Sequence, residues 1–305
     1  MEKREICPVC GYDRSRDAAK YPALAKLREG AAPSGGGSSP DGARIAALEA
    51  RVAALEEQLD RQVYSLPITE NPAIWAGEKG YVRLRKGAAL PDGVAVPAVW
   101  KGEPVTVLGS FEFSNSLIRR VVLPEGITDI GRHCFEGCGR LVEVELPSTL
   151  RWIGPSAFSG CEKLERALLP DAVEAVADAT FFNCRSLREV KLPAALRTIG
   201  ERAFRYCERL ERIEIPAGAT VIGAEAFADC TSLREARLPD GLGWIENRAF
   251  AGCSALREIA VPDGIKNVRT DAFVSCEALE KVSLPGSLRG LKLRLRQSCR
   301  VEYRD

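Results

Sequence analysis

Apolar and polar residues alternate along the chain in short segments, and the alternation returns with a period of 23 residues. In one segment, Leu210, Ile213 and Ile215 are apolar, and Pro216 follows directly. Prolines keep the same step, at positions 124, 147, 170, 193, 216, 239, 262 and 285. Because proline cannot donate a backbone hydrogen bond, the pattern predicts a short strand that ends at the proline.

Two further sets of residues keep this step. Phenylalanines stand at positions 135, 158, 181, 204, 227, 250 and 273. A cysteine follows each of them after three residues, and one more stands at 299. The Ala-Phe-x-x-Cys segments predict tight helical turns whose Phe faces inward. Since one unit cannot bury its own apolar edge, we expect successive units to stack as coils.

These residues resemble the BspA-like leucine-rich repeat family, whose unit runs roughly as L-x-x-I-x-L-P-x-x-L-x-x-I-G-x-x-A-F-x-x-C. The segment LERIEIPAGATVIGAEAFADC carries this pattern, and the resemblance extends over about 94 to 299. It implies an α/β repeat solenoid, that is, a leucine-rich repeat array of parallel short strands with tight helical turns. VAVPAVWKGEPVTVLGSFEFSN resembles the capping first turn of such arrays, and GLKLRLRQSCRVEYRD a terminal capping strand.

Some positions depart from the family pattern. The first unit has Asn115 or Ser116 where the cysteine would stand, and it is one residue short. The glycine of the Ile-Gly pair is replaced at Ala177, Glu246, Arg269 and Lys292. Cys299 keeps the register in a segment that lacks Ala-Phe, so we do not expect it to share the role of the other repeat cysteines.

The repeat cysteines have a structural and a chemical interpretation. Stacked coils place them in a column inside the solenoid, where a free thiol packs as a small apolar residue. The alternative is a metal-binding or redox column, which requires thiolates that converge on one point. Parallel stacked side chains do not converge, and a buried thiol without cationic neighbours is inert. The sequence therefore favours the structural role, with thiols rather than disulfides.

The outward positions of the predicted strands carry alternating charges. In a parallel ladder, opposite charges on neighbouring strands attract, which fixes the register and leaves no single-sign surface for nucleic acid. A partner-binding surface is the alternative interpretation, and the less charged stretches from Val122 to Leu168 and from Ala260 to Ser283 suit apolar contact. The candidate partner-binding residues are Glu143, Arg166, Glu189, Arg212, Glu235, Lys191, Glu214 and Arg237.

A different composition precedes the repeats. ARIAALEARVAALEEQLDRQ has apolar residues at heptad positions, which favours a parallel two-stranded coiled coil and a homodimer. The alternative is an amphipathic helix that folds onto its own solenoid. The predicted dimerisation residues are Ile45, Leu48, Val52, Leu55 and Leu59. The predicted segments are a zinc-knuckle-like segment (1–31), a Gly/Ser linker (32–43), the coiled-coil helix (44–63), a connecting segment (64–93) and the solenoid with its caps (94–305).

The first segment contains CPVCG, in which Cys7 and Cys10 have the spacing of half a zinc ribbon. Zinc takes four ligands in structural sites. A parallel dimer would bring two such pairs together and complete a four-sulfur zinc site between chains. A vestigial knuckle and a redox pair remain alternatives, because a single C-x-x-C is a weak signal.

Composition bears on the function class. The chain has 43 basic and 42 acidic residues, so it has no overall attraction to nucleic acid or anionic membranes. No apolar run approaches the roughly 18 to 20 residues that span a bilayer. No secretory signal is visible in MEKREICPVCG, and we therefore expect a cytoplasmic location.

No catalytic constellation stands out in the sequence. The single histidine, His133, precedes Cys134, but adjacent side chains do not make a nucleophile-base pair without further geometry. We expect a surface histidine beside a packed thiol. The sequence therefore predicts a non-catalytic protein-protein interaction module. The alternative is a zinc-knuckle regulatory or nucleic-acid-associated adaptor in which the solenoid is accessory.

Overall fold

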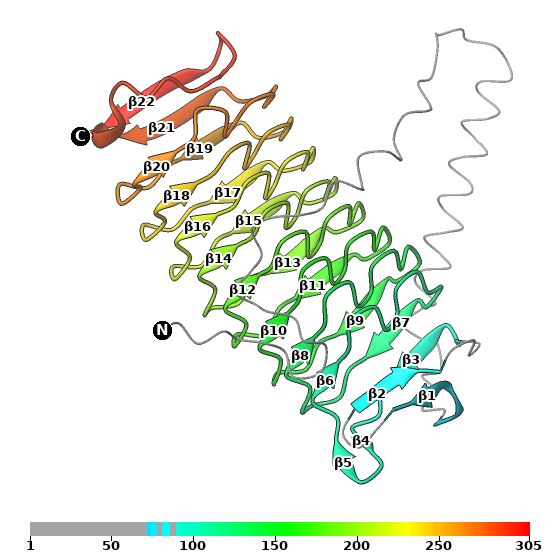
Figure 1. Cartoon of the computed structure of the whole chain (residues 1–305). Coiled ribbons are helices and arrows are strands. Elements are labelled where there is room, and N and C mark those ends of the chain that lie inside the picture. Colours follow the sequence, from blue (N-terminus) through cyan, green and yellow to red (C-terminus); the bar gives the residue numbers. More distant parts are fainter. Residues whose placement is uncertain (1–71, 78–80, 86–89) are drawn as a thin grey trace, which may run out of the picture. The chain divides into compact units, whose positions relative to one another are not determined.

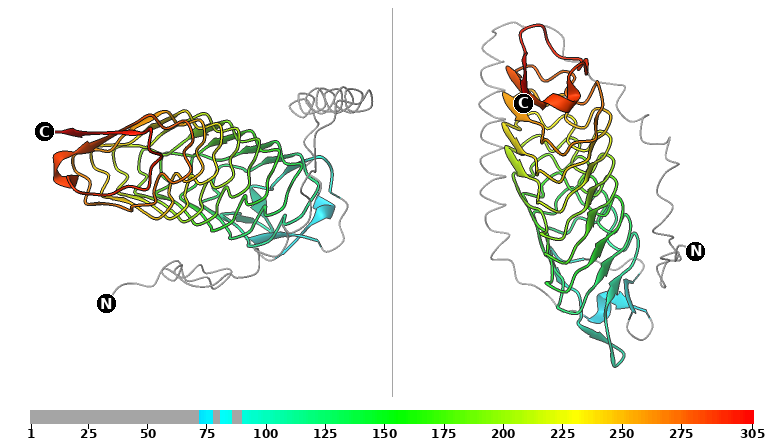
Figure 2. Two further views of the ribbon diagram at one scale, coloured as in Figure 1. Left: turned by 90° about the horizontal axis from the view of Figure 1, so that it is seen from above. Right: turned by 90° about the vertical axis from the view of Figure 1, so that its left-hand side faces the viewer.

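The computed structural model describes residues 72–77, 81–85 and 90–305, all within one compact unit that spans residues 67–305. This unit is a solenoid of about 10 turns built from parallel strands, with almost no helix (Figure 1). Its coils follow one another along a single axis (Figure 2). Among the described residues, the helical segments are two short 3-10 helices, η3 (Pro72–Ile74) and η4 (Gly286–Leu288).

The first strand row contains the strands that the alternating pattern predicts. Its members pair in parallel in four groups of two or three strands, and in the regular repeats equivalent residues 23 positions apart stand opposite each other, as Arg212 stands opposite Glu235. The central residue, such as Ile213, points into the core, while its neighbours on the strand point outward. The row comprises β3 (Gly93–Ala95), β7 (Arg120–Val122), β9 (Glu143–Glu145), β11 (Arg166–Leu168), β13 (Glu189–Lys191), β15 (Arg212–Glu214), β17 (Glu235–Arg237), β19 (Glu258–Ala260), β21 (Lys281–Pro285) and β22 (Arg300–Arg304).

A second strand row forms another side of each coil, which the sequence pattern did not predict. Most of its strands are two residues long, with one residue outward and one apolar residue in the core, as in Thr198 and Ile199. Its members pair in parallel in two successive groups, one for each half of the row. They are β2 (Tyr81–Leu84), β6 (Val107–Leu108), β8 (Asp129–Ile130), β10 (Trp152–Ile153), β12 (Ala175–Val176), β14 (Thr198–Ile199), β16 (Val221–Ile222), β18 (Trp244–Ile245) and β20 (Asn267–Val268).

Two antiparallel pairs lie near the start of the described chain. Strand β1 (Trp75–Ala76) pairs with β2, and β4 (Val99–Trp100) pairs with β5 (Glu103–Pro104). At the other end, β22 pairs in parallel with β21 over five residues. The predicted terminal strand is therefore confirmed. No helix within the described ranges has the length and apolar character needed to cross a membrane.

The third side of each coil is the turn row, which contains the Ala-Phe-x-x-Cys segments. The predicted tight helical turns are wrong. In the repeat around Phe158, Ser156 and Gly160 have positive φ angles of 55° and 73°, and such left-handed residues end a right-handed helix. The same two places, two residues before and two after the Phe, are left-handed in most coils.

Alternate backbone groups of the turn row bond from coil to coil. The N–H groups of Phe135 and Gly137 donate to the carbonyl oxygens of Ala157 and Ser159, both over 2.7 Å. The groups between them close local turns, as when Glu136 N donates to His133 O over 3.2 Å. The turn row thus has its own ladder of inter-coil bonds and needs no helix to satisfy its backbone.

The core of the solenoid is a continuous stack of side chains. Eight phenylalanines, from Phe113 to Phe273, are fully buried and stack in order. Neighbouring ring centroids lie 5.0 to 5.7 Å apart, with interplanar angles of 2° to 16°. The prediction that the Phe faces inward is confirmed. Phe113 belongs to the same stack, although its coil is one residue shorter.

Candidate functional site

The repeat cysteines form a buried column beside the phenylalanine stack. From Cys138 to Cys276, each Sγ donates to the carbonyl oxygen of the Phe one coil earlier, over 2.9 to 3.3 Å. All cysteines of the described chain are free. Cys299 is half-buried, and its nearest acceptor is the carbonyl of Arg300 at 3.9 Å. The structural interpretation of the column and the different role of Cys299 are confirmed.

Burial also sets the chemistry of this column. It raises the pKa of the Cys276 thiol to about 12, and it raises the pKa values of Cys161 and Cys207 well above the ordinary range. The thiolate is the nucleophile and the metal ligand, so these protonated thiols are inert at neutral pH. Within the described residues, no group of three or more His, Cys, Asp and Glu side chains is arranged to hold a metal ion.

The charged column on the first strand row comprises the outward residues Arg120, Glu143, Arg166, Glu189, Arg212, Glu235, Glu258 and Lys281. Opposite charges stand in register on paired strands. The ion pairs Arg120–Glu143, Arg166–Glu189 and Arg212–Glu235 have N–O distances of 3.1, 2.7 and 3.9 Å. The cross-strand attractions expected from the alternating signs are therefore present.

The other predicted partner-binding residues also lie on this row. Lys191 Nζ is 3.7 Å from Asp171 Oδ1, and Arg237 Nε is 2.6 Å from Glu235 Oε1 on its own strand. Glu214 and Arg237 line a shallow groove of about 370 Å³ with Pro216 and neighbouring residues. The structure thus brings all eight predicted residues onto the first strand row.

Two large apolar side chains of the first strand row are exposed, Leu168 among the central coils and Tyr303 on the terminal strand β22. Leu168, the last residue of β11, is 47% exposed, whereas the other apolar residues of its strand and the next turn, Ala167 and Leu169, are buried. The register places Leu168 opposite Lys191. Its strand neighbour Arg166 is held by Glu189. An exposed leucine enclosed by paired charges has the composition of a small binding centre with a polar rim.

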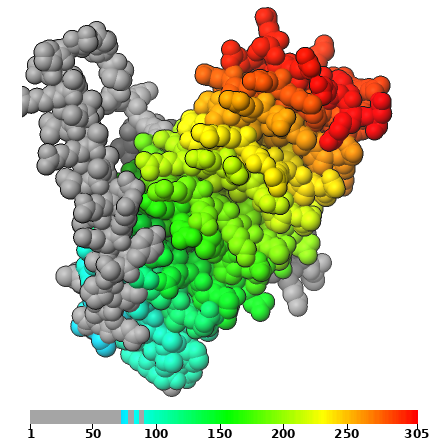
Figure 3. Space-filling view, turned by 180° about the vertical axis from the view of Figure 1, so that it is seen from behind, coloured from blue at the N-terminus to red at the C-terminus, as the bar shows by residue number. Residues whose placement is uncertain are grey.

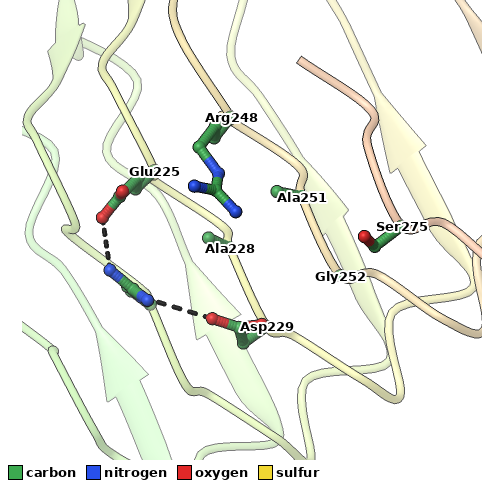
Figure 4. A pocket seen from close by; sticks show the side chains of 8 residues that line it. Glu225, Ala228, Asp229, Arg248, Ala251, Gly252 and Ser275 are labelled. Atoms are coloured by element: carbon green, nitrogen blue, oxygen red, sulfur yellow. Dashed lines mark hydrogen bonds and ion pairs between the residues drawn. The ribbon is translucent and has the colours of Figure 1, made fainter. Parts of the chain in front are cut away.

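A hollow of about 60 Å³ lies on the turn row (Figure 4). On one side, Arg205 binds both Glu225 and Asp229, and its guanidinium lies 4.7 Å from the ring centre of Tyr206. Arg248 stands across the hollow, and Ala228, Ala251, Gly252 and Ser275 complete its lining. Pockets for small ligands measure about 300 to 1,000 Å³. The hollow is therefore too small for a typical organic ligand.

His133 has a different environment from the one expected. The ring is half-buried, stacks on Phe111 with the centroids 4.7 Å apart, and has its Nδ1 3.0 Å from Glu136 Oε2. The histidine thus lies at the surface only in part, because the exposed Phe111 covers one ring face. Cys134 packs in the core, as predicted, and burial raises its pKa well above the ordinary range. His133 and Cys134 therefore do not form an activated thiol.

The sequence did not single out the outward residues of the second strand row. Trp152 and Trp244 are half-buried there, and Lys266 Nζ lies 4.7 Å from the Trp244 ring centre. Seen from behind, the described coils follow one another as successive bands up to the C-terminal strand (Figure 3). The signal that the sequence analysis missed is the residue directly before the Ile of each Ile-Gly pair. This residue points outward in every two-residue strand of the row, as Thr198 does before Ile199.

Several predictions fall on residues 1–71, which lie outside the described part of the chain. They are the zinc site at Cys7 and Cys10 and the dimerisation residues Ile45, Leu48, Val52, Leu55 and Leu59. The cytoplasmic location, the lack of catalytic activity and the lack of nucleic-acid binding also stay predictions.

The repeat geometry defines this part of the chain as a leucine-rich repeat solenoid. In sequence, residues 106–234 and 197–303 match the BspA type leucine rich repeat region, with 6 copies. Because these matches cover more than half of the sequence, the chain belongs to the BspA type leucine-rich repeat family. A comparison with curated proteins finds no match.

Several solved structures are similar to this chain. A leucine rich cell surface protein from Faecalibacterium prausnitzii A2-165 is 20% identical, with a TM-score of 0.36, and the match covers 79% of this chain and 96% of that one. The Treponema pallidum leucine rich repeat protein is 27% identical, with a TM-score of 0.44 and coverage of 68% and 86%. A leucine-rich repeat protein from Bacteroides ovatus is 18% identical, with a TM-score of 0.29 and coverage of 76% and 98%.

Proposed function

We propose that this protein is a non-catalytic scaffold that binds another protein through the first strand row, with Leu168 at the centre of the contact. The observation that carries this proposal is the exposure of Leu168, 47%, in a row whose other outward side chains are mostly charged. A solenoid presents an extended surface of this kind to partners.

The charges around Leu168 act mainly through pairing. Arg166 and Glu189 form an ion pair of 2.7 Å, and Arg188 and Glu165 form one of 2.9 Å. An exposed pair contributes only about 0.2–1 kcal/mol, so a partner displaces it at small cost. The pairs also leave little unbalanced charge. A protein surface with an apolar centre therefore suits this row better than a phosphate backbone does.

Binding energy in such interfaces concentrates in a few central side chains, while the rim excludes water. In this proposal, Leu168 is the central side chain, and Arg166, Glu189 and Lys191 form the rim. The partner then needs an apolar side chain at its centre and mixed charges around it. A uniformly acidic or basic partner meets like charges at alternate coils.

Capture from an extract of the cells that produce the protein tests this proposal. The full chain carrying Leu168→Glu is compared with the wild type and with Asn247→Glu, which adds the same charge at an exposed position of the turn row. We expect the Leu168→Glu chain to capture at least tenfold less of the partner than the wild type does, because the variant places a charge at the apolar centre. Capture by Asn247→Glu should equal that of the wild type. Equal capture by all three chains contradicts the proposal.

The sequence also supports dimerisation by the helix over residues 44–63, which would present two solenoids together. The zinc-knuckle adaptor remains the alternative function, and it rests on Cys7 and Cys10. Both proposals depend on the N-terminal sequence pattern and are tested separately from the Leu168 surface.

A further inference from the structure

The outward residues of the second strand row form a column along the solenoid. The register places Asp129 beside Trp152, and places Thr198 between its neighbours on β12 and β16. The 23-residue period connects Trp152 to Ala175. The complete set, named here the Trp column, is Asp129, Trp152, Ala175, Thr198, Val221, Trp244 and Asn267.

The Trp column differs in chemistry from the charged column. No side chain from Trp152 to Trp244 in this column is ionisable. The residues between the two tryptophans are small or β-branched, and Ala175 is exposed while Thr198 and Val221 are half-buried. Aromatic side chains are enriched at protein interfaces, and charged ones are depleted at interface centres. The column therefore has the composition of an interface centre.

The order of residues in the Trp column is nearly symmetrical about Thr198. One coil away on either side stand Ala175 and Val221, and two coils away stand Trp152 and Trp244. In a two-fold interface the same patch serves on both subunits, so residue i meets residue j and j meets i. A two-fold axis along the Thr198 strand would place the tryptophans of one chain opposite those of the other.

The ends of the column are complementary in charge under the same operation. Asp129 lies three coils before Thr198, and Asn267 with its strand neighbour Lys266 lies three coils after it. The axis therefore brings Asp129 of one chain opposite Asn267 of the second copy, with Lys266 of that copy one residue away along the chain, and this happens twice. Charges arranged in this way favour one register and one orientation over others.

One neighbouring residue opposes this arrangement, although its effect is limited. Arg197 precedes Thr198 and would lie close to its own copy near the axis. Glu174, one coil earlier, holds Arg197 with an N–O distance of 4.0 Å. The two Glu174 carboxylates would therefore lie near the axis together with the two Arg197 guanidinium groups. Their negative charges reduce the repulsion between the two arginines.

We propose that the Trp column is a docking surface for a second copy of this chain, with the two solenoids antiparallel and the two-fold axis at Thr198. Seven coils at roughly 4.8 Å each give a contact about 30 Å long between the outer strands. The column is one residue wide, so the buried area falls below the roughly 800 Å² per partner of stable complexes. The interface is accordingly a weak one.

Disulfide trapping tests the axis directly. The full chain with Cys7→Ser and Cys10→Ser receives Thr198→Cys, and mild oxidation is followed by a non-reducing gel. Because Thr198 meets its own copy, we expect a covalent dimer, which the parent without Thr198→Cys does not form. Glu189→Cys, in the same coil on the first strand row, is the matched control and should stay monomeric.

A second pair of variants fixes the orientation. Ala175 and its own copy would be separated by two coils, roughly 9.6 Å, which exceeds the 7 Å limit for Cα atoms in a disulfide. Chains with Ala175→Cys alone or Val221→Cys alone should therefore stay monomeric, whereas a mixture of the two should cross-link. Cross-linking of Ala175→Cys with itself at the rate of Thr198→Cys overturns the proposal, as does the absence of a dimer with both Thr198→Cys and the mixture.

Charge exchange supplies an independent measurement. In the Thr198→Cys chain, Asp129→Lys and Lys266→Asp should each reduce the rate of cross-linking several-fold. The double variant should restore it, because it re-creates both pairs with the signs exchanged. A double variant that cross-links no faster than the single variants contradicts the proposed register. Each variant is first compared with the parent by circular dichroism, so that only folded chains are interpreted.

Discussion

The Sγ atom of Cys207 donates a hydrogen bond to the carbonyl oxygen of Phe181, one coil earlier, over 3.3 Å. The same carbonyl also accepts the backbone N–H of Cys184 in its own turn, over 3.3 Å. Both lone pairs of the buried oxygen are thus used. The repeat cysteines therefore connect neighbouring coils, and this role explains their spacing without any reactive chemistry.

Replacing Cys207 by alanine removes this donor and leaves a small cavity. We expect the free energy of unfolding to fall by about 1–3 kcal/mol, from the lost packing and the lost hydrogen bond. Urea unfolding measures the loss. The matched control is Cys299→Ala, which removes a half-buried thiol outside the column and should cost less than about 0.5 kcal/mol. Equal losses for the two variants contradict the connecting role.

Stability should fall at alkaline pH. Burial raises the pKa of Cys276 to about 12, while a thiol in the unfolded chain titrates near about 8.5. Between these pH values the folded chain binds more protons than the unfolded chain. Each unit of increase in pH therefore lowers the free energy of unfolding by about 1.4 kcal/mol per thiol. The stabilisation is complete below about pH 8.5 and is lost as the pH rises towards about 12.

The variant Cys276→Ala isolates this effect. Its deficit in unfolding free energy relative to the wild type should shrink by about 1.4 kcal/mol per pH unit above about pH 9. Unfolding curves at pH 8 and pH 10.5 supply the comparison. A deficit that stays constant over this range contradicts the assignment of a buried, protonated thiol.

Ala179 shows the cost of the turn-row backbone. Its φ angle is 52°, a left-handed conformation that disfavours residues with a Cβ by roughly 1–2 kcal/mol. We expect Ala179→Gly to raise the unfolding free energy by about 1 kcal/mol. The control in the same coil is Ala175→Gly, where an extended strand residue should lose about 0.5–1 kcal/mol. Destabilisation of both variants to the same extent contradicts the assigned conformation of Ala179.

Zinc analysis and light scattering together test the N-terminal predictions. We expect one zinc per two chains, because Cys7 and Cys10 supply two of the four ligands. Leu55→Glu should abolish both the helix-mediated dimer and the zinc, since it places a charge in the predicted seam. Ala54→Glu lies outside that seam and should change neither. A monomer that retains a full zinc site, or a wild-type chain without zinc, contradicts the interchain site.

The stacked architecture could be predicted from the sequence because its strongest determinants are periodic and buried. The alternation that ends at Pro216 predicts strand β15, and the regular Phe positions predict the stacked core. The second strand row escaped prediction for a physical reason. Strands such as Thr198–Ile199 have two residues, and a single outward-inward pair cannot be distinguished from a turn.

The helical turns were predicted wrongly for the turn row although the sequence contains a signal against them. The Ala-Phe-x-x-Cys segment has the length of one helical turn, but the residue two positions after the Phe is Gly160, Asn183 or Asp229 in different coils. Glycine, asparagine and aspartate tolerate the left-handed region better than other residues. That preference indicated a break in the helix and was readable from the sequence.

The candidate site could be predicted in part. Alternating signs at Arg166 and Glu189 predicted their ion pair, because parallel strands with a fixed period place equivalent residues together. The period also placed Leu168 among the outward positions, two residues before Pro170. The degree of its exposure depends on how the neighbouring side chains fold, which the period does not encode. The symmetry about Thr198 became apparent only once the second strand row was known.

A photo-cross-linking amino acid at position 168 tests the proposed binding surface most directly. The full chain is irradiated in an extract of the cells that produce it, and covalent adducts are identified by mass spectrometry. We expect one protein to be attached at position 168 and not at Asn247, an exposed residue of the turn row. Because the same cross-linking amino acid is used at both positions, the second position measures the labelling that chance contacts produce. Equal labelling at the two positions, or no adduct at position 168, would contradict the proposal that this solenoid binds its partner through the first strand row.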